Sequence, residues 1–200
     1  MIKVSNLTFR YSDDDKLIFD QASLTLEAGL WLLEGENGSG KTTLLKLLAS
    51  NAEDRKKLGS IADESVIDVS EEVVLLDNQL AIPGHLNEAS FVNYLLSIND
   101  VTLKQPYQPR YEKKPLYEYS TGEQKMVIFQ LLSYLKPKVL LLDEYISNLD
   151  EEHIPEAIGY LESMANKGCL ILCSSNELDI RGRFSNKVKI VDRKLEKNVE

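Results

Sequence analysis

The stretch that decides the fold of this chain is Gly35-Glu36-Asn37-Gly38-Ser39-Gly40-Lys41-Thr42-Thr43. It fits the pattern G-x-x-x-x-G-K-(S/T), whose glycines let the backbone curl and turn successive N–H groups toward one point. Lys41 is placed to reach the β- and γ-phosphates of a nucleotide, and the Thr42 hydroxyl to bind Mg²⁺. A helix that begins at Lys41 would add its positive N-terminal charge. We therefore expect every residue of the stretch to line a site for nucleoside triphosphate and Mg²⁺.

The flanking residues supply the context that this loop requires. Leu30–Glu34 is short and apolar, as expected of a buried strand, and residues 43–49 carry apolar side chains at helical spacing. Strand, glycine loop and helix form the arrangement that binds phosphate. The alternative is a glycine-rich turn that binds nothing.

Composition narrows the range of partners. The 200 residues fit one domain, or one domain with an inserted lobe, and 43% hydrophobic residues allow a real core. A formal net charge of -9 argues against nucleic acid as a partner and against a polybasic membrane anchor. Cys169 and Cys173 share one apolar run and are interpreted as core residues. The two histidines, His85 and His153, lie far apart in the sequence, and we expect no cluster of metal ligands around them.

The first part of the chain predicts an antiparallel layer of strands. Residues 2–10 and 17–26 alternate between apolar and polar side chains, and residues 60–70 carry a weaker strand pattern. Tyr11 closes the first strand, and either offers its ring to adenine or is an ordinary strand-end tyrosine. We expect residues 51–59 to form a loop and residues 192–200 a charged tail.

A second group of acidic residues follows the buried strand predicted at Val139–Leu142. The first, Asp143, can hold Mg²⁺, and the second, Glu144, can accept a proton from an attacking water. Upstream, Ser120 and Glu123 fit a capping box at the start of a helix that stops at Pro137.

These motifs, in this order, resemble the nucleotide-binding domain of the ABC (ATP-binding cassette) ATPases. Residues 35–42 match the Walker A loop, and residues 139–144 match the Walker B strand with its additional glutamate. Residues 119–123 resemble the signature usually written LSGGQ. The remaining matches are Gln79 to the Q-loop glutamine, residues 147–150 to the D-loop with Ser147 and Asp150, and Tyr11 to the adenine-stacking aromatic.

The resemblance implies an α/β P-loop fold in a single domain spanning residues 1–200. That fold has a mainly parallel core sheet, an antiparallel side layer and a small helical subdomain near residues 84–136. It also implies Mg²⁺ bound by Thr42, Gln79 and Asp143, and two domains that associate head to tail around two ATP molecules. Each ATP would lie between the phosphate loop of one domain and the signature of the other, where we expect Ser120, Thr121, Gly122 and Glu123 to make the contact.

The chain departs from the family pattern at three positions. Thr121 replaces a signature glycine, and Glu123 replaces the signature glutamine and adds a negative charge unless capping occupies it. Ser175 aligns with the catalytic switch histidine, and no histidine follows His153. Serine can still donate one hydrogen bond but cannot carry a positive charge, so we expect hydrolysis that is slow.

The sequence therefore predicts an ATP-hydrolysing transporter subunit that works with separate transmembrane subunits, as a homodimer or a heterodimer. We expect it in the cytoplasm, at the inner face of the membrane, with residues 80–86 as the docking surface for a coupling element. The alternatives are a soluble ABC ATPase that acts on a macromolecule, and a regulatory module with little turnover. The transported substrate is not predicted, because specificity in this family lies in the membrane subunits.

Overall fold

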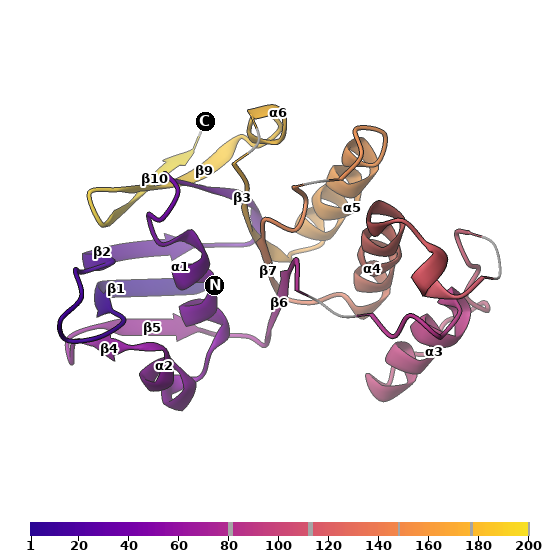
Figure 1. Ribbon diagram of the computed structural model, residues 1–200, viewed down its shortest axis with the longest axis horizontal. Helices are drawn as coiled ribbons and strands as arrows, with labels where there is room; N and C mark the ends of the chain where they lie inside the picture. The colour runs from indigo at the N-terminus through magenta and orange to yellow at the C-terminus, as the bar shows by residue number, and fades with distance from the viewer. Residues whose placement is uncertain (80–81, 112–113, 148, 177, 200) are drawn as a thin grey trace.

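The computed structural model describes the chain except residues 80–81, 112–113, 148, 177 and 200 (Figure 1). Its centre is a six-stranded sheet in the order β10-β9-β3-β8-β7-β6. These strands are β3 (Gly29–Glu34), β6 (Val73–Asp77), β7 (Val139–Asp143), β8 (Leu170–Ser174), β9 (Asn186–Val191) and β10 (Lys194–Val199). All neighbours pair in parallel except β9 and β10, so the predicted, mainly parallel sheet is confirmed.

The predicted antiparallel layer is also confirmed. Its central strand is β1 (Ile2–Arg10), which pairs antiparallel with β2 (Phe19–Leu26), β4 (Ser60–Ile61) and β5 (Val66–Val69). The buried side chains of β1 change from even to odd positions, from Ile2 and Val4 to Leu7 and Phe9. The change falls at Asn6, whose φ of 51° accompanies a shift in the pairing register.

The two faces of the core sheet carry different helices, as Figure 1 shows. Because strand side chains alternate, Leu141 packs with α1 (Lys41–Ala49) and the antiparallel layer, whereas Leu140 and Leu142 pack against α4 (Thr121–Leu135) and α5 (Ile154–Asn166). With both faces covered, the parallel strands become continuous apolar runs. Cys169 and Cys173 pack among the side chains on the face that α4 and α5 cover. Both thiols are free and buried, as predicted.

The remaining helices are α2 (Ala52–Leu58), α3 (Glu88–Ile98), the 3₁₀ segment η1 (Leu116–Glu118) and α6 (Leu178–Arg181). Residues 84–136 thus contain α3, η1 and α4, and α3 lies on the side of α4 remote from the core sheet (Figure 1).

The prediction of a loop at residues 51–59 was wrong, because α2 occupies most of it. The Asn51 side chain accepts hydrogen bonds from the N–H groups of Glu53 and Asp54, at 2.9 Å each, and so caps the helix. Acidic side chains in its first turn and basic ones in its last complement the helix dipole. No residue of α2 is buried, so the apolar period that reveals a helix in sequence is missing.

The prediction of a charged tail at residues 192–200 was also wrong. Asp192 and Arg193 adopt positive φ values of 47° and 64°, and turn the chain into β10, which pairs with β9 as a hairpin. Leu195 is the buried residue of this strand, while its charged neighbours face solvent. The alternation was obscured because charged residues dominate this stretch of the sequence.

Candidate nucleotide-binding site

The phosphate loop takes its shape from glycines at two tight points. Gly40 precedes α1 with a φ of 108°, and a Cβ at this position would lie 2.6 Å from the Ile18 Cγ2 atom. A Cβ at Gly35 would lie 2.4 Å from the Ser39 Oγ atom. Gly40 is therefore required by both its backbone conformation and its neighbours, and a larger residue at Gly35 would displace the Ser39 side chain.

Lys41 lies within the loop that it serves. Its side chain is 7% exposed, and Nζ donates to the backbone oxygens of Gly35, at 2.9 Å, and Glu36, at 3.1 Å. Among the described residues no carboxylate forms an ion pair with this ammonium group. Its positive charge is therefore available to an anion that enters the loop.

A pocket of about 490 Å³ opens beside the loop and brings several predicted residues together. It is lined by Tyr11, Ile18, Asn37, Gly38, Gly40, Lys41, Thr42, Thr43, Glu144 and Asn176. Tyr11 is half exposed, and its hydroxyl shares a hydrogen bond of 2.6 Å with the Thr43 hydroxyl. The aromatic residue from the end of β1 thus lies at the mouth of the phosphate loop.

The strand that leads into the loop is fixed by a buried carboxylate. Glu34, at the end of β3, is 6% exposed, and accepts from Arg181 Nε at 3.0 Å with Lys189 Nζ at 3.7 Å. Burial by itself would raise the pKa of Glu34, but the hydrogen bond and charge of Arg181 lower it below its usual value. The carboxylate therefore stays ionised and ties β3 to β9 and α6.

Asp143 and Glu144 lie at the carboxyl end of β7, where strand-end side chains of neighbouring strands converge. The Ser174 hydroxyl donates to Asp143 Oδ1 at 2.8 Å and accepts from the Glu144 N–H at 2.9 Å. Asn78 Nδ2 donates to the Glu144 backbone oxygen at 3.1 Å. These contacts hold Glu144 at a φ of 49°, which is unusual for a residue with a side chain.

Asn176 contacts Glu144 directly, and sequence reasoning missed it. Its Nδ2 atom donates to Glu144 Oε1 at 2.6 Å and to Asn37 Oδ1 at 3.1 Å. Asn78 and Ser174 were missed in the same way. All three come at the carboxyl ends of β6 and β8, the two strands that flank β7, and this placement was the signal that could have identified them.

Two predicted residues are not brought to the phosphate loop. Ser175 is 2% exposed, and its hydroxyl lies 3.3 Å from that of Ser147. Gln79 is exposed and its N–H donates to Asp77 Oδ1 at 2.9 Å. Neither residue lines the pocket that holds Lys41 and Glu144. Leu80 and Ala81 of the proposed docking surface, and Asn148 of the D-loop, lie outside the described residues.

The capping box predicted before α4 is confirmed. The Ser120 hydroxyl accepts from the Glu123 N–H at 3.1 Å, and Glu123 Oε2 accepts from the Ser120 N–H at 2.8 Å. The Glu123 carboxylate is therefore occupied by the cap. The D-loop lies against the same helix: a Cβ at Gly122 would lie 3.1 Å from Asp150 Oδ2.

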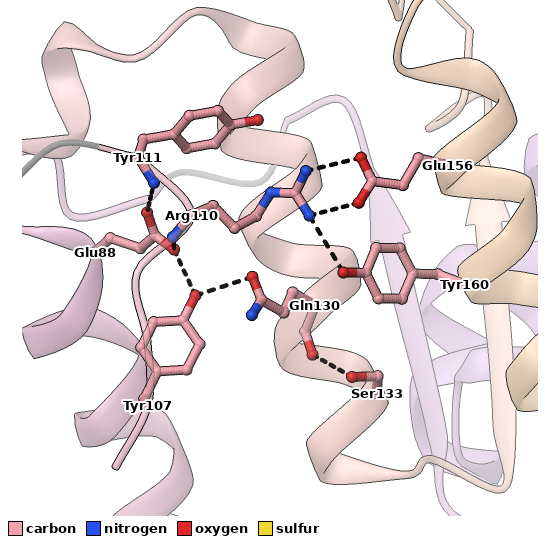
Figure 2. A network of polar contacts seen from close by, with 8 residues as sticks. All are labelled: Glu88, Tyr107, Arg110, Tyr111, Gln130, Ser133, Glu156 and Tyr160. Atoms are coloured by element: carbon pink, nitrogen blue, oxygen red, sulfur yellow. Dashed lines mark hydrogen bonds and ion pairs between the residues drawn. The ribbon is translucent and has the colours of Figure 1, made fainter.

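A buried carboxylate supports the segment that precedes this helix. Glu88, on α3, is 1% exposed and accepts from the Tyr107 hydroxyl at 2.5 Å and the Arg110 N–H at 2.8 Å (Figure 2). It also accepts from the Tyr111 N–H at 3.3 Å and the Tyr119 hydroxyl at 3.1 Å. Burial, with Glu88 nearby, raises the pKa of Tyr119, so this phenol stays a donor.

Arg110 extends this support to α5. Its Nη1 and Nη2 atoms donate to the two carboxylate oxygens of Glu156, at 2.7 and 2.8 Å, and Nη1 donates to the Tyr160 hydroxyl at 3.2 Å (Figure 2). The hydrogen bond from Arg110 is the main reason that the pKa of Glu156 is lowered. The segment before the signature is thus fastened to α3 on one side and to α5 on the other.

Within one chain the two predicted halves of the site do not meet. No described residue from 120–123 lines the pocket beside the phosphate loop, and Thr121 instead borders a separate hollow with Asn78 and Tyr145. Each chain therefore presents a phosphate loop and a capped helix N-terminus at different places.

A glycine loop that leads from β3 into a helix, with a carboxylate pair at the carboxyl end of β7, two strands away in the same sheet, defines the class of P-loop ATPases. Comparison with known proteins narrows the class: the profile of the ABC transporter family matches residues 19–147, and the chain belongs to that family and is an ATPase. Among the described residues, no helix has the length and apolar character needed to span a membrane.

Two known ATP-binding proteins are similar to this chain over most of their own length. The chain is 25% identical over 195 residues to the cytochrome c biogenesis ATP-binding export protein CcmA of Vibrio cholerae, covering 88% of this chain and 91% of the relative. It is 27% identical to the energy-coupling factor transporter ATP-binding protein EcfA of Methanosphaera stadtmanae, covering 99% of this chain and 78% of the relative.

Solved structures share the fold at low identity. An ATP-binding subunit of an ABC transporter has a TM-score of 0.79 and 16% identity, covering 100% of this chain and 90% of that one. A dimeric ATP-binding cassette in a post-hydrolysis state, bound to ADP and Pi, has a TM-score of 0.71 and 14% identity, covering 98% of both chains.

Proposed function

We propose that this chain hydrolyses ATP to energise transport through separate membrane-spanning subunits, at the inner face of the cell membrane. Membership of the ABC transporter family supports the proposal, as do the names of its relatives, one an export protein and one a transporter subunit. These relatives do not favour the alternative of a soluble ATPase that acts on a macromolecule.

One observation carries the proposal: Lys41, Thr42 and Glu144 line the same pocket of about 490 Å³. The Lys41 ammonium and the N–H groups of the loop bind the phosphates, and the ring of Tyr11 is available to adenine. Glu144 accepts the proton of the attacking water, because it lines the same pocket as the phosphate loop and carries a carboxylate that can act as a base.

The residues present also suit Mg²⁺. Thr42 and Asp143 offer oxygen ligands, which Mg²⁺ prefers, and leave its other positions to water and phosphate. Gln79 would join them only after moving from its place beside Asp77. Mg²⁺ held by these residues would supply positive charge that offsets the negative charge of the bound phosphates.

A second chain completes each site in this proposal. The capped N-terminus of α4 directs backbone N–H groups and the exposed Ser120 hydroxyl outward, which suits a γ-phosphate bound in the loop of a partner. Residues 84–136 form the helical lobe that carries this signature, with Ser147 and Asp150 of the D-loop packed beside it. The partner is a second copy or a related ATP-binding subunit.

Ser175 stands at the sequence position of the switch histidine, so we propose slow turnover with normal ATP affinity. The direct experiment measures phosphate release by the purified chain with ATP, in the presence of Mg²⁺ and after its removal by EDTA. We expect steady release that stops when Mg²⁺ is removed. ATP binding without any release under either condition would favour a regulatory module and contradict the proposal.

A further inference from the structure

Arg181, on the short helix α6, lies outside the motifs of the sequence. We propose that Arg181 is a positioning residue for nucleotide binding: it cancels the charge of Glu34, the buried carboxylate at the base of the phosphate loop, and so keeps the loop attractive to phosphates. Arg181 does not line the pocket that holds Lys41, and therefore acts through Glu34. This role depends on the proposed function only in that the loop binds ATP.

Glu34 places a negative charge directly beside a site for an anion. It precedes Gly35, the first residue of the loop, whose backbone oxygen accepts from Lys41 Nζ at 2.9 Å. The Glu34 side chain is 6% exposed, so little water is present to weaken the field of its charge. Without compensation, this carboxylate would repel the phosphates that Lys41 attracts.

Two cations compensate the charge of Glu34. Arg181 Nε donates to Glu34 Oε1 at 3.0 Å, and Lys189 Nζ lies 3.7 Å from Oε2. Arg181 is thus the closer partner, and its bond is of the strong kind in which both groups are charged. Burial by itself raises the pKa of Glu34, and Arg181 is the main group that lowers it. The pair therefore holds an ionised carboxylate whose charge is cancelled where it arises.

A cavity of about 590 Å³ adjoins this ion pair and contains the other charges that Glu34 faces. The phosphate loop and the turn from β9 to β10 both border it, and its charged lining residues are Glu34, Glu36, Arg181, Lys189, Asp192 and Arg193. Lys187 also acts on Glu34 by its charge. Glu36 and Asp192 are exposed, so water and salt screen them. Among these lining residues, Glu34 is the buried carboxylate that needs a partner.

Removing the cation should weaken binding, and removing the carboxylate as well should restore it. For Arg181→Gln we expect the Kd for Mg²⁺-ATP to rise roughly 10-fold, because an uncompensated buried charge acts strongly on nearby phosphates. The double variant Arg181→Gln with Glu34→Gln should bind nearly as tightly as wild type. Arg181→Lys, which keeps the charge, should also stay close to wild type. Calorimetry measures each Kd, and thermal unfolding verifies that each variant is folded.

The effect of pH separates a role of charge from a role of shape alone. In Arg181→Gln the burial of Glu34 remains while its main cation is lost, so the pKa of Glu34 should be higher than in wild type. As the pH falls, this carboxylate takes up a proton and becomes neutral. The ratio of the Kd of Arg181→Gln to that of wild type should therefore shrink in acid. ATP titrates equally in both measurements, so the ratio removes its contribution.

The matched control is Arg183→Gln, which removes the same charge two residues away, at an exposed position that does not line the cavity. If Arg181→Gln does not fold, Lys189→Gln takes its place. It should give a smaller rise in Kd, because Lys189 lies farther from the carboxylate, and Glu34→Gln should abolish that rise too.

Three results would overturn the role of Arg181. They are a double variant that binds as weakly as Arg181→Gln, or as Lys189→Gln where that variant is used, an equal effect of Arg183→Gln, and a Kd ratio that is the same at every pH. The proposed function survives all three if the wild-type chain binds and hydrolyses ATP. A wild-type chain that binds no ATP overturns the proposed function and the role of Arg181 together.

Discussion

The phosphate loop and the signature are built in opposite ways. The loop is shaped by its own backbone, and its lysine turns back onto the carbonyl groups of Gly35 and Glu36. The signature has a local cap, but the segment before it depends on the buried carboxylate of Glu88, which collects donors from three places in the chain. The first half is local in sequence, and the second is assembled from distant residues.

This difference suits what each half has to do. A loop that surrounds a phosphate needs backbone N–H groups in the correct directions, and a short glycine-rich sequence supplies them. In the dimer that we propose, a helix N-terminus that meets a phosphate on another chain must be held at a fixed place by the body of its own chain. Glu88 and Arg110 provide this support through α3 and α5 (Figure 2).

The largest expected effect on turnover comes from Glu144→Gln, in the half of the site that contains the phosphate loop. The amide cannot accept the proton of water, so we expect kcat to fall at least about 10²-fold, within the range typical of a lost general base. ATP affinity should remain, and the chain should accumulate as a dimer with bound ATP. Phosphate release and light scattering measure the two effects. A variant that is dimeric without nucleotide and does not respond to ATP would contradict the head-to-tail arrangement.

Lys41→Ala should weaken ATP binding in the same half. The loss of the buried cation leaves phosphate charge uncompensated, and we expect the Kd to rise roughly 10²-fold, equivalent to about 3 kcal/mol for a charged hydrogen-bonding group. Calorimetry with Mg²⁺-ATP measures the change. Lys46→Ala, at an exposed position of the same helix, is the matched control. Equal affinity in the two variants would remove Lys41 from the site.

Glu88→Gln should affect the half of the site that contains the signature. The amide nitrogen adds donors where Arg110, Tyr107 and Tyr119 already donate, and the free energy of unfolding should fall by about 1–3 kcal/mol. ATP binding by the single chain should be nearly unchanged, but dimer formation with ATP should weaken because the signature is displaced. The exposed Glu118→Gln serves as control. If Glu88→Gln weakens ATP binding as much as dimer formation, the two halves are not independently supported.

The local character of the loop half explains how much the sequence could predict. Residues 35–43, the carboxylates after β7 and the capping box at Ser120 were recognisable because each is a short pattern with its own geometry. The partners of Glu88 were not, since the donors at Tyr107, Arg110 and Tyr119 converge only through the tertiary fold. Asn176 was hidden for a similar reason, because the pairing of β7 with β8 brings it to Glu144. The helix α2 has no fully buried residue and therefore left no apolar period.

The smallest effect concerns the link from Arg110 to Glu156. Arg110 lowers the pKa of Glu156 below its usual 4.5, so the pair stabilises the fold above that pH and the contribution is lost as the pH falls through the lower folded-state value. Glu156 is half exposed, so Glu156→Gln should lower the melting temperature at pH 7 by only about 2 °C. The difference from wild type should vanish in acid. The exposed Glu162→Gln on the same helix should show no such pH dependence.

The most direct test of the central claim, that the two halves act across two chains, is a mixing experiment. Lys41→Ala disables the loop, and Ser120→Arg obstructs the signature, so each variant alone should be inactive. In a mixed dimer, the intact loop of one chain faces the intact signature of the other, and random pairing should restore roughly a quarter of the wild-type phosphate release. A mixture that stays inactive, while the wild-type chain alone is active and both variants are folded, would show that the phosphate loop and Ser120 serve the same chain and would contradict the account.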